Sequence, residues 1–196
     1  MRASCALSFL GKTFHLKFQT FDTPIEPTAG ISARIPHTTE YVILLDYDNV
    51  VDPRLRDELV YLQELHHLGD FHVFATNEFG RHVACIDRLP LRKALQVVHT
   101  STCDFNFKQG VRINEYRTWI LRALEKGNRP KPKYLYSIES NYNGRRLQSE
   151  AHGLFFLNYY GAQIRLAKPD GNTELEVQGY KTGSKINVKD LETKIK

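Results

Sequence analysis

The sequence contains few cysteines, the residues that form the disulfides of small secreted domains or bind a structural zinc ion. Its 196 residues include three cysteines, Cys5, Cys85 and Cys103, whose separations do not match a metal-ligand motif. An odd, scattered set of cysteines is typical of a reducing compartment rather than of a disulfide framework. No stretch approaches the roughly 18 apolar residues of a membrane span, and the first residues lack the apolar core of a signal peptide. We therefore expect a cytoplasmic protein without a membrane partner.

Internal repeats and low-complexity tracts are absent too, and the length suits one domain or one domain with an appendage. The hydrophobic fraction of 41% is enough for a packed core. Apolar and polar residues alternate before a loop rich in proline, which suggests an N-terminal arm or edge strand over residues 1–40. We expect the core over residues 41–170 and a polar, peripheral C-terminal tail over residues 171–196.

The most informative stretch is residues 41–50, an apolar run that ends in Asp46 and Asp48. On a strand these two carboxylates lie on one face, where they repel each other unless a cation lies between them. Mg²⁺ is bound by one or two carboxylates together with substrate phosphates. An acidic turn after a buried strand is the alternative interpretation, because Asp and Asn favour turns.

The order of expected elements is strand, helix, strand, strand, helix, strand. It predicts an α+β fold with an RRM-like or ferredoxin-like split β-α-β sheet core, additional strands and a C-terminal helix. Residues 71–76 and 81–87 form the expected hairpin, and residues 111–122 contain at least one more strand, with a second joined to it near Tyr116. Both helices of this pattern cover one face of the sheet, so the other face is expected to be open and functional.

Basic residues are concentrated in the second half of the chain. Residues 108–146 contain ten basic and three acidic residues, a net charge of +7, whereas the whole chain carries +5. A basic segment next to a metal-like acidic site suits the handling of phosphates. A solvated surface is the alternative. The nucleic-acid-binding candidates from this segment are Arg129, Lys131, Lys133, Arg145 and Arg146.

The chain resembles the archaeo-eukaryotic primase superfamily, the primase-polymerases. The first motif of that family, an apolar strand that ends in Asp-x-Asp, is matched by residues 44–48. The second, a small residue or Gly before a His that opens an apolar strand, is matched by Gly80 and His82, although Arg81 stands between them. The third, an acid followed by an apolar-apolar-Arg segment, is similar to Glu115 and Arg122. The similarity covers roughly residues 41–140.

The resemblance implies a nucleotidyltransferase that synthesises or extends a primer from nucleoside triphosphates on a DNA template. It implies that Mg²⁺ or Mn²⁺ is the cofactor, that Asp46, Asp48 and Glu115 are the catalytic and metal-binding residues, and that a replicative helicase is a possible partner. The nucleotide-binding residues implied in the same way are Gly80, Arg81, His82, Arg122 and Lys126.

Two other classes of protein stay open. If the third acid is missing, the chain is a nucleic-acid-binding replication module on a decayed primase fold. A metal-dependent nuclease of the NYN/PIN type also begins with an apolar strand and an Asp near an Asn, but it needs further acids on later strands. Asp104 is the nearest candidate for such an acid, and in the sequence it is isolated. The predicted order of elements also disfavours the parallel sheet of those nucleases.

Overall fold

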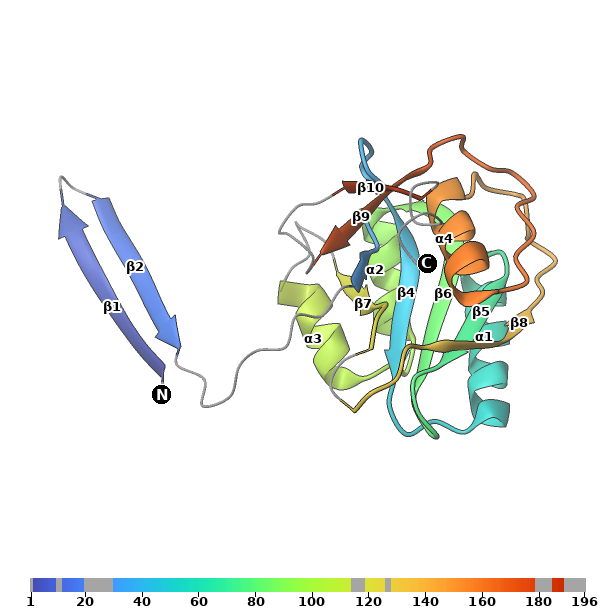
Figure 1. The fold of residues 1–196 in the computed structure, drawn as a ribbon, viewed down its shortest axis with the longest axis horizontal. Coiled ribbons are helices and arrows are strands. Elements are labelled where there is room, and N and C mark those ends of the chain that lie inside the picture. The colour runs from blue at the N-terminus through green and yellow to red at the C-terminus, as the bar shows by residue number, and fades with distance from the viewer. Residues whose placement is uncertain are drawn as a thin grey trace.

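The structure is a computed structural model, and it describes residues 2–9, 12–19, 30–113, 119–125, 128–178 and 185–188. Within these residues the chain forms an α+β fold with four helices and two four-stranded antiparallel sheets, as predicted at that level (Figure 1). The first two strands pair with each other as a hairpin. Along the chain the elements are β1 (Arg2–Phe9), β2 (Lys12–Gln19), β3 (Gly30–Ser32), β4 (Glu40–Tyr47), α1 (Asp52–His66), β5 (Phe71–Ala75), β6 (Arg81–Pro90), α2 (Leu91–Thr100), α3 (Phe105–Ile113), β7 (Ile120–Arg122), β8 (Lys133–Ile138), α4 (Glu150–Tyr160), β9 (Glu174–Gln178) and β10 (Lys185–Asn187).

The central sheet has the strand order β4-β6-β5-β8. Strand β6 lies between β4 and β5 and is antiparallel to both, so β4 and β5 run in the same direction with α1 between them in the chain. This is a split β-α-β arrangement, and the predicted hairpin of β5 and β6 is confirmed. The fourth position, beside β5, belongs to β8.

Strand β4 forms the centre of the core because its apolar run is covered on both faces. Val42, Ile43, Leu44 and Leu45 are all 0% exposed. Such a continuous apolar and β-branched run is typical of a strand that is buried on both sides. Asp46, near the end of this strand, is therefore held on a rigid element.

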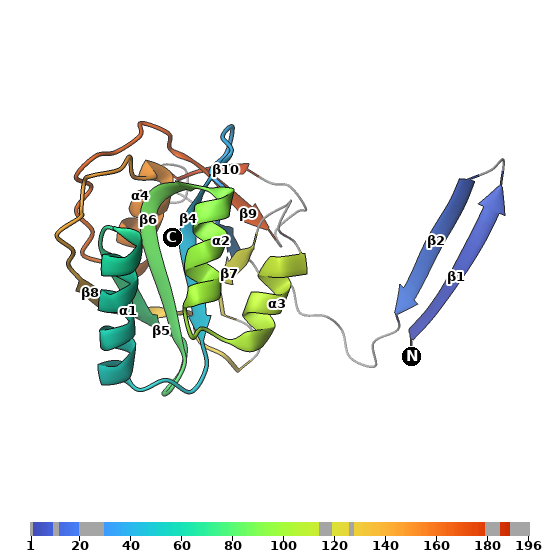
Figure 2. The same ribbon diagram turned by 180° about the vertical axis from the view of Figure 1, so that it is seen from behind.

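Helices α1 and α2 cover one face of the central sheet, and α4 lies against the other (Figure 1; Figure 2). On the second face Phe74 of β5 packs against two α4 residues, with ring centroids 5.0 Å from Phe156 and 5.2 Å from Tyr160. The prediction of an open face is therefore wrong for the part around β5. Large aromatic side chains on α4 bury apolar sheet surface that would otherwise be in contact with water.

Of residues 111–122 the structure describes 111–113 and 119–122, and these contain one strand, β7, which does not belong to the central sheet. Helix α3 continues to Ile113, and β7 pairs with β3 in the second sheet. The helix is capped by Asp104, whose Oδ1 accepts a hydrogen bond from the backbone N–H of Phe107 at 2.9 Å. An Asp in the N-cap position satisfies a backbone donor that the helix leaves unpaired. The cap therefore favours a helix, although apolar and polar residues alternate over 111–113 as they would in a strand.

The second sheet has the order β10-β9-β3-β7 and joins segments from the whole length of the chain. Strand β3 lies in the expected N-terminal arm, and β9 and β10 lie in the expected tail. Leu175 and Val188 of that tail are buried at 0% and 1% exposure. The expected boundaries at residues 40 and 170 thus cut through a sheet, and the described part of residues 171–196 is not peripheral.

Helix α4 is tied to this second sheet by the buried side chain of His152. Its Nε2 donates to the Ser32 carbonyl at 2.8 Å, and its Nδ1 accepts from the Ser149 hydroxyl at 2.8 Å. A carbonyl oxygen can only accept a hydrogen bond, so the proton of the neutral imidazole is on Nε2. Burial lowers the pKa of His152 to about 4. Because Ser149 and His152 are both 0% exposed, this Ser–His pair is a structural link and not an accessible nucleophile.

Candidate functional site

Strand register brings three side chains of the central sheet together on one face. Asp46 of β4 pairs with His82 of β6, and His82 pairs with Phe74 of β5. Directly cross-strand neighbours share a face. Phe74 packs against α4, whereas Tyr47, one residue after Asp46, donates a hydrogen bond to Glu58 of α1 at 2.9 Å. Asp46 and His82 therefore lie on the α4 side of the sheet.

Asp46 and His82 are in close contact but do not form an ion pair at neutral pH. His82 Nε2 lies 3.5 Å from Asp46 Oδ1, and the two side chains are 5% and 34% exposed, respectively. Burial, with a smaller contribution from Arg122, lowers the pKa of His82 to about 3. The imidazole is neutral at pH 7, so it can give a single N–H to a ligand without adding a positive charge.

The carboxylate of Asp46 is unusually basic for an Asp. Burial, followed by the nearby charges of Asp48 and Asp104, raises its pKa to about 6, although Arg122 and Arg129 oppose the shift. Like charges and desolvation both penalise an ionised carboxylate. A bound cation would relieve both penalties, so this group favours either a proton or a metal ion.

Asp104 is the acid that the sequence left isolated and that the structure brings beside Asp46. The backbone N–H of Asp104 donates to the carbonyl of Asp46 at 2.7 Å. Its carboxylate is turned toward the first turn of α3, where Oδ1 accepts from Phe107. Among the described residues, no three His, Cys, Asp or Glu side chains converge on one metal position.

Glu115 and Lys126, two residues expected at the site, lie outside the described residues. The argument for Glu115 assumed that residues 111–113 form a strand, but these residues end helix α3. The expected role of Glu115 therefore stays a prediction without that support, and Asp104 becomes the first candidate for the third acid.

Arg122 of β7 joins the cluster from the second sheet. Its charge acts on both Asp46 and His82, and partial burial lowers its own pKa. One guanidinium nitrogen, Nη1, donates to the carbonyls of Leu124 at 2.6 Å and Pro130 at 2.8 Å. These two bonds fix the guanidinium group against the loop that follows β7, so the positive charge is held near the acids.

Arg81 and Gly80 stabilise the turn that precedes β6. The guanidinium of Arg81 binds Asp52 at 2.9 Å and donates to three carbonyls of the turn, including that of Gly80 at 2.9 Å. Arg81 pairs with Tyr47, so it lies on the opposite face from His82. A Cβ on Gly80 would approach Thr76 Oγ1 to 2.3 Å. Neither residue joins the cluster, and both have structural roles.

The predicted nucleic-acid-binding residues divide between two ends of the central sheet. Lys133 pairs with Ala75, which pairs with Arg81, so Lys133 lies at the end that carries His82. Arg129 lies close enough for its charge to lower the pKa of Asp46. These two exposed residues therefore lie at the same end as the cluster.

Lys131 lies at that end as well, against the last turn of α4. Its Nζ is 3.6 Å from the centre of the Tyr159 ring and donates to the Tyr159 carbonyl at 2.7 Å. Arg145 and Arg146 follow the opposite end of β8, where Arg145 stacks on Tyr142 and Arg146 donates to the His66 carbonyl at 3.4 Å. The structure does not bring this pair to the cluster.

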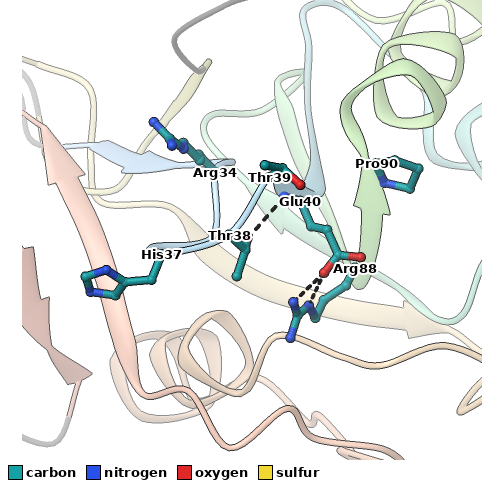
Figure 3. A pocket seen from close by; sticks show the side chains of 7 residues that line it. All are labelled: Arg34, His37, Thr38, Thr39, Glu40, Arg88 and Pro90. Atoms are coloured by element: carbon teal, nitrogen blue, oxygen red, sulfur yellow. Dashed lines mark hydrogen bonds and ion pairs between the residues drawn. The ribbon is translucent and has the colours of Figure 1, made fainter.

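A hollow at the other end of β4 is separate from the Asp46 cluster (Figure 3). Glu40 at its edge pairs with Pro90, six positions along the strand from Asp46. Arg88 in the hollow forms ion pairs with Glu40 and with Asp170, the latter at 3.1 Å. The charge of Arg88 is thus offset within the protein, and the hollow does not contribute to the candidate site. Its lining residues are Arg34, His37, Thr38, Thr39, Glu40, Arg88 and Pro90.

Comparisons of the chain with protein-family models, with curated protein sequences and with solved structures found no match. In the parts of the chain that the structure describes, none of the helices has the length and apolar character needed to span a bilayer. The function must therefore be argued from the geometry of the Asp46 cluster and from the motifs of the sequence.

Proposed function

We propose that the chain is a nucleotidyltransferase of the primase-polymerase type, which extends a primer on a DNA template from nucleoside triphosphates. The observation that carries the proposal is the surroundings of Asp46, which lies 3.5 Å from the buried His82 and within range of the charges of Asp48, Asp104 and Arg122. The interleaved strands β4, β6 and β5 support a primase-like, RRM-related core. The motif resemblance assigns the metal role to Asp46 and the phosphate role to His82 and Arg122.

Asp46 and Asp48 are the residues that would hold a divalent cation, with Asp104 as the third ligand if its carboxylate turns away from the α3 cap. Mg²⁺ usually takes only one or two protein carboxylates and completes its shell with phosphates and water. A site without three converged ligands therefore still fits this cation. When bound, the cations would activate the attacking 3′-hydroxyl and stabilise the leaving pyrophosphate.

The protein residues bind and orient the triphosphate. Neutral His82 donates its single N–H to a phosphate oxygen, at a position fixed by strand β6. Arg122 supplies positive charge where negative charge develops, and its position is already fixed by two carbonyls. Donors that are fixed before the reaction need no reorganisation during it, which is the main source of electrostatic catalysis. Arg129, Lys131 and Lys133 hold the phosphates of the template strand at the same end.

A non-catalytic nucleic-acid-binding module is the second candidate, because the Asp104 carboxylate is engaged as a helix cap. A nuclease of the NYN/PIN type is disfavoured. Asp104 does supply a third acid near Asp46, but every described strand ladder is antiparallel, whereas those nucleases have a parallel sheet.

Primer extension with purified protein tests the proposal. Wild-type protein is expected to add nucleotides to a primed template in the presence of Mg²⁺ or Mn²⁺, and Asp46→Asn should abolish this activity. Asp57→Asn is the matched control, since Asp57 is an exposed residue of α1 on the opposite side of the sheet. Binding of template without any extension by the wild type would favour the non-catalytic module.

Asp46→Asn should also stabilise the fold at neutral pH. A carboxyl whose native pKa is raised from 3.8 to about 6 stabilises the fold below pH 3.8, and this contribution is lost as the pH rises to about 6. Asn cannot ionise, so the variant is not destabilised in this way as the pH rises. Its free energy of unfolding at pH 7 should exceed the wild-type value by about 1 to 3 kcal/mol, the full shift reduced by solvent screening. Denaturant titrations at pH 7 and below pH 4 measure the difference, which should disappear at the lower pH.

A further inference from the structure

The two acids Asp46 and Asp104 belong to separate elements, so something must fix the distance between them. Asp46 lies on β4, whereas Asp104 lies in the short segment between α2 and α3. Helix α1, on the opposite face of the sheet from Asp46, supplies the connection through Glu58.

Glu58 uses both carboxylate oxygens to join β4 to this segment. Its Oε1 accepts from the Tyr47 hydroxyl at 2.9 Å and from the backbone N–H of Thr102 at 2.6 Å. Its Oε2 accepts from the Thr102 hydroxyl. Tyr47 follows Asp46 directly, and Thr102 precedes Asp104 by two residues. Hydrogen bonds to a charged acceptor are about twice as strong as neutral ones, so Glu58 clamps the two backbones together.

The clamp acts at the point where the Asp104 backbone meets β4. The Asp104 N–H donates to the Asp46 carbonyl at 2.7 Å. On the α2 side, the segment is anchored by Ser101, whose hydroxyl donates to the Val98 carbonyl at 2.8 Å. The Ser101 hydroxyl fixes the segment to α2, and Glu58 fixes it through Tyr47 to the strand that carries Asp46.

We infer that Glu58 is a positioning residue that holds the backbone of Asp104 beside the Asp46 site. The contacts of Glu58 stand without the proposed function. Their expected effect on the binding of a divalent cation rests on it. Glu58 touches no ligand in this account and acts through Thr102 and Asp104. Residues that hydrogen-bond metal ligands typically change metal affinity by about 10–100-fold when they are replaced, and the effect of Glu58, which contacts only the neighbours of Asp46 and Asp104, is expected at the lower end of this range.

Amide hydrogen exchange and Mn²⁺ titration of the full chain test the inference together. Glu58→Ala should accelerate exchange of the Asp104 amide by at least about tenfold, because local opening becomes easier. It should weaken Mn²⁺ binding by about tenfold as well. Thr102→Val is a milder change, so it should accelerate exchange of the Asp104 amide and weaken Mn²⁺ binding to a smaller extent. Glu64→Ala is the matched control, since Glu64 is also on α1 and also accepts a tyrosine hydroxyl, that of Tyr142 at 3.1 Å.

A double-variant cycle shows whether Glu58 acts through Asp104. On an Asp104→Asn background, Glu58→Ala should not weaken Mn²⁺ binding further, because residues that act through one another are not additive. Additive losses, or an Asp104 amide that exchanges as slowly in Glu58→Ala as in the wild type, would overturn the inference. Faster exchange together with a wild type that binds no Mn²⁺ would uphold Glu58 as the positioning residue and refute the proposed function instead.

Discussion

Asp104→Asn is expected to reduce nucleotide incorporation by at least about a hundredfold, the size of effect seen when one electrostatic contact to a transition state is removed. The fold should be unaffected, because Asn is as good an N-cap as Asp and the hydrogen bond from the Phe107 N–H can be kept. Primer extension and thermal unfolding, measured on the same preparation, separate the two effects.

Asp104→Ala serves as the comparison for this variant. It removes the helix cap as well as the charge, so the free energy of unfolding should fall by about 1 kcal/mol. Wild-type incorporation by Asp104→Asn would show that Asp104 is only a cap. Glu115→Gln would then be the next variant, with loss of incorporation and retained triphosphate binding as its predicted result.

Replacement of Arg129, Lys131 and Lys133 by Gln together should weaken binding of a single-stranded template by more than tenfold at low salt. It should also flatten the salt dependence, since each lost phosphate contact reduces the slope of log K against log salt by about 0.7 for single strands. Fluorescence anisotropy over a range of salt concentrations measures both quantities. The three residues lie at the Asp46 end of the sheet, so they are placed to hold template near the acids.

Arg145 and Arg146 provide the control for this experiment. Each carries the same positive charge as a residue of the first set and comes from the same basic segment of the sequence, but the two arginines lie at the other end of β8. Their joint replacement by Gln should leave the salt slope near the wild-type value. If the two sets of replacements flatten the slope equally, the template does not prefer the Asp46 end.

The sequence was sufficient to predict the strand that carries Asp46 and the hairpin that carries His82. Both predictions rest on short-range signals, an apolar β-branched run and a turn of four residues that ends in Gly80. The register that pairs Asp46 with His82 follows from those two elements, because a shift by one residue would put the apolar set of each strand on the wrong face.

The approach of Asp104 to Asp46 could not be predicted, because its placement depends on tertiary contacts. Asp104 is far from Asp46 in sequence, and it reaches β4 only because α2 ends at Thr100 and Glu58 holds the segment that follows. A local signal did exist, since an Asp directly before a helix is a typical N-cap. It was hidden because the end of α3, with Val111 and Ile113, alternates like a strand.

The placement of α4 over the sheet was also beyond the sequence pattern. Residues 148–160 are recognisable as a helix, but their apolar residues do not say which face of the sheet they cover. Phe74 and Phe156 meet because side-chain shapes fit in the folded core, and shape complementarity of this kind is not visible in a periodic pattern. The structural role of Arg81 was not visible in the sequence either, because its ion-pair partner Asp52 lies 29 residues away, on α1.

Titration of Mn²⁺ into the protein in the presence of a nucleoside triphosphate, followed by electron paramagnetic resonance, tests the central claim most directly. If Asp46, Asp48 and Asp104 form a cation site beside His82 and Arg122, wild-type protein should bind Mn²⁺ with the triphosphate. Each single Asp→Asn replacement at these positions should weaken that binding by at least about tenfold, and Asp57→Asn should not. Equal Mn²⁺ affinity in the wild type and in all three variants would contradict the account.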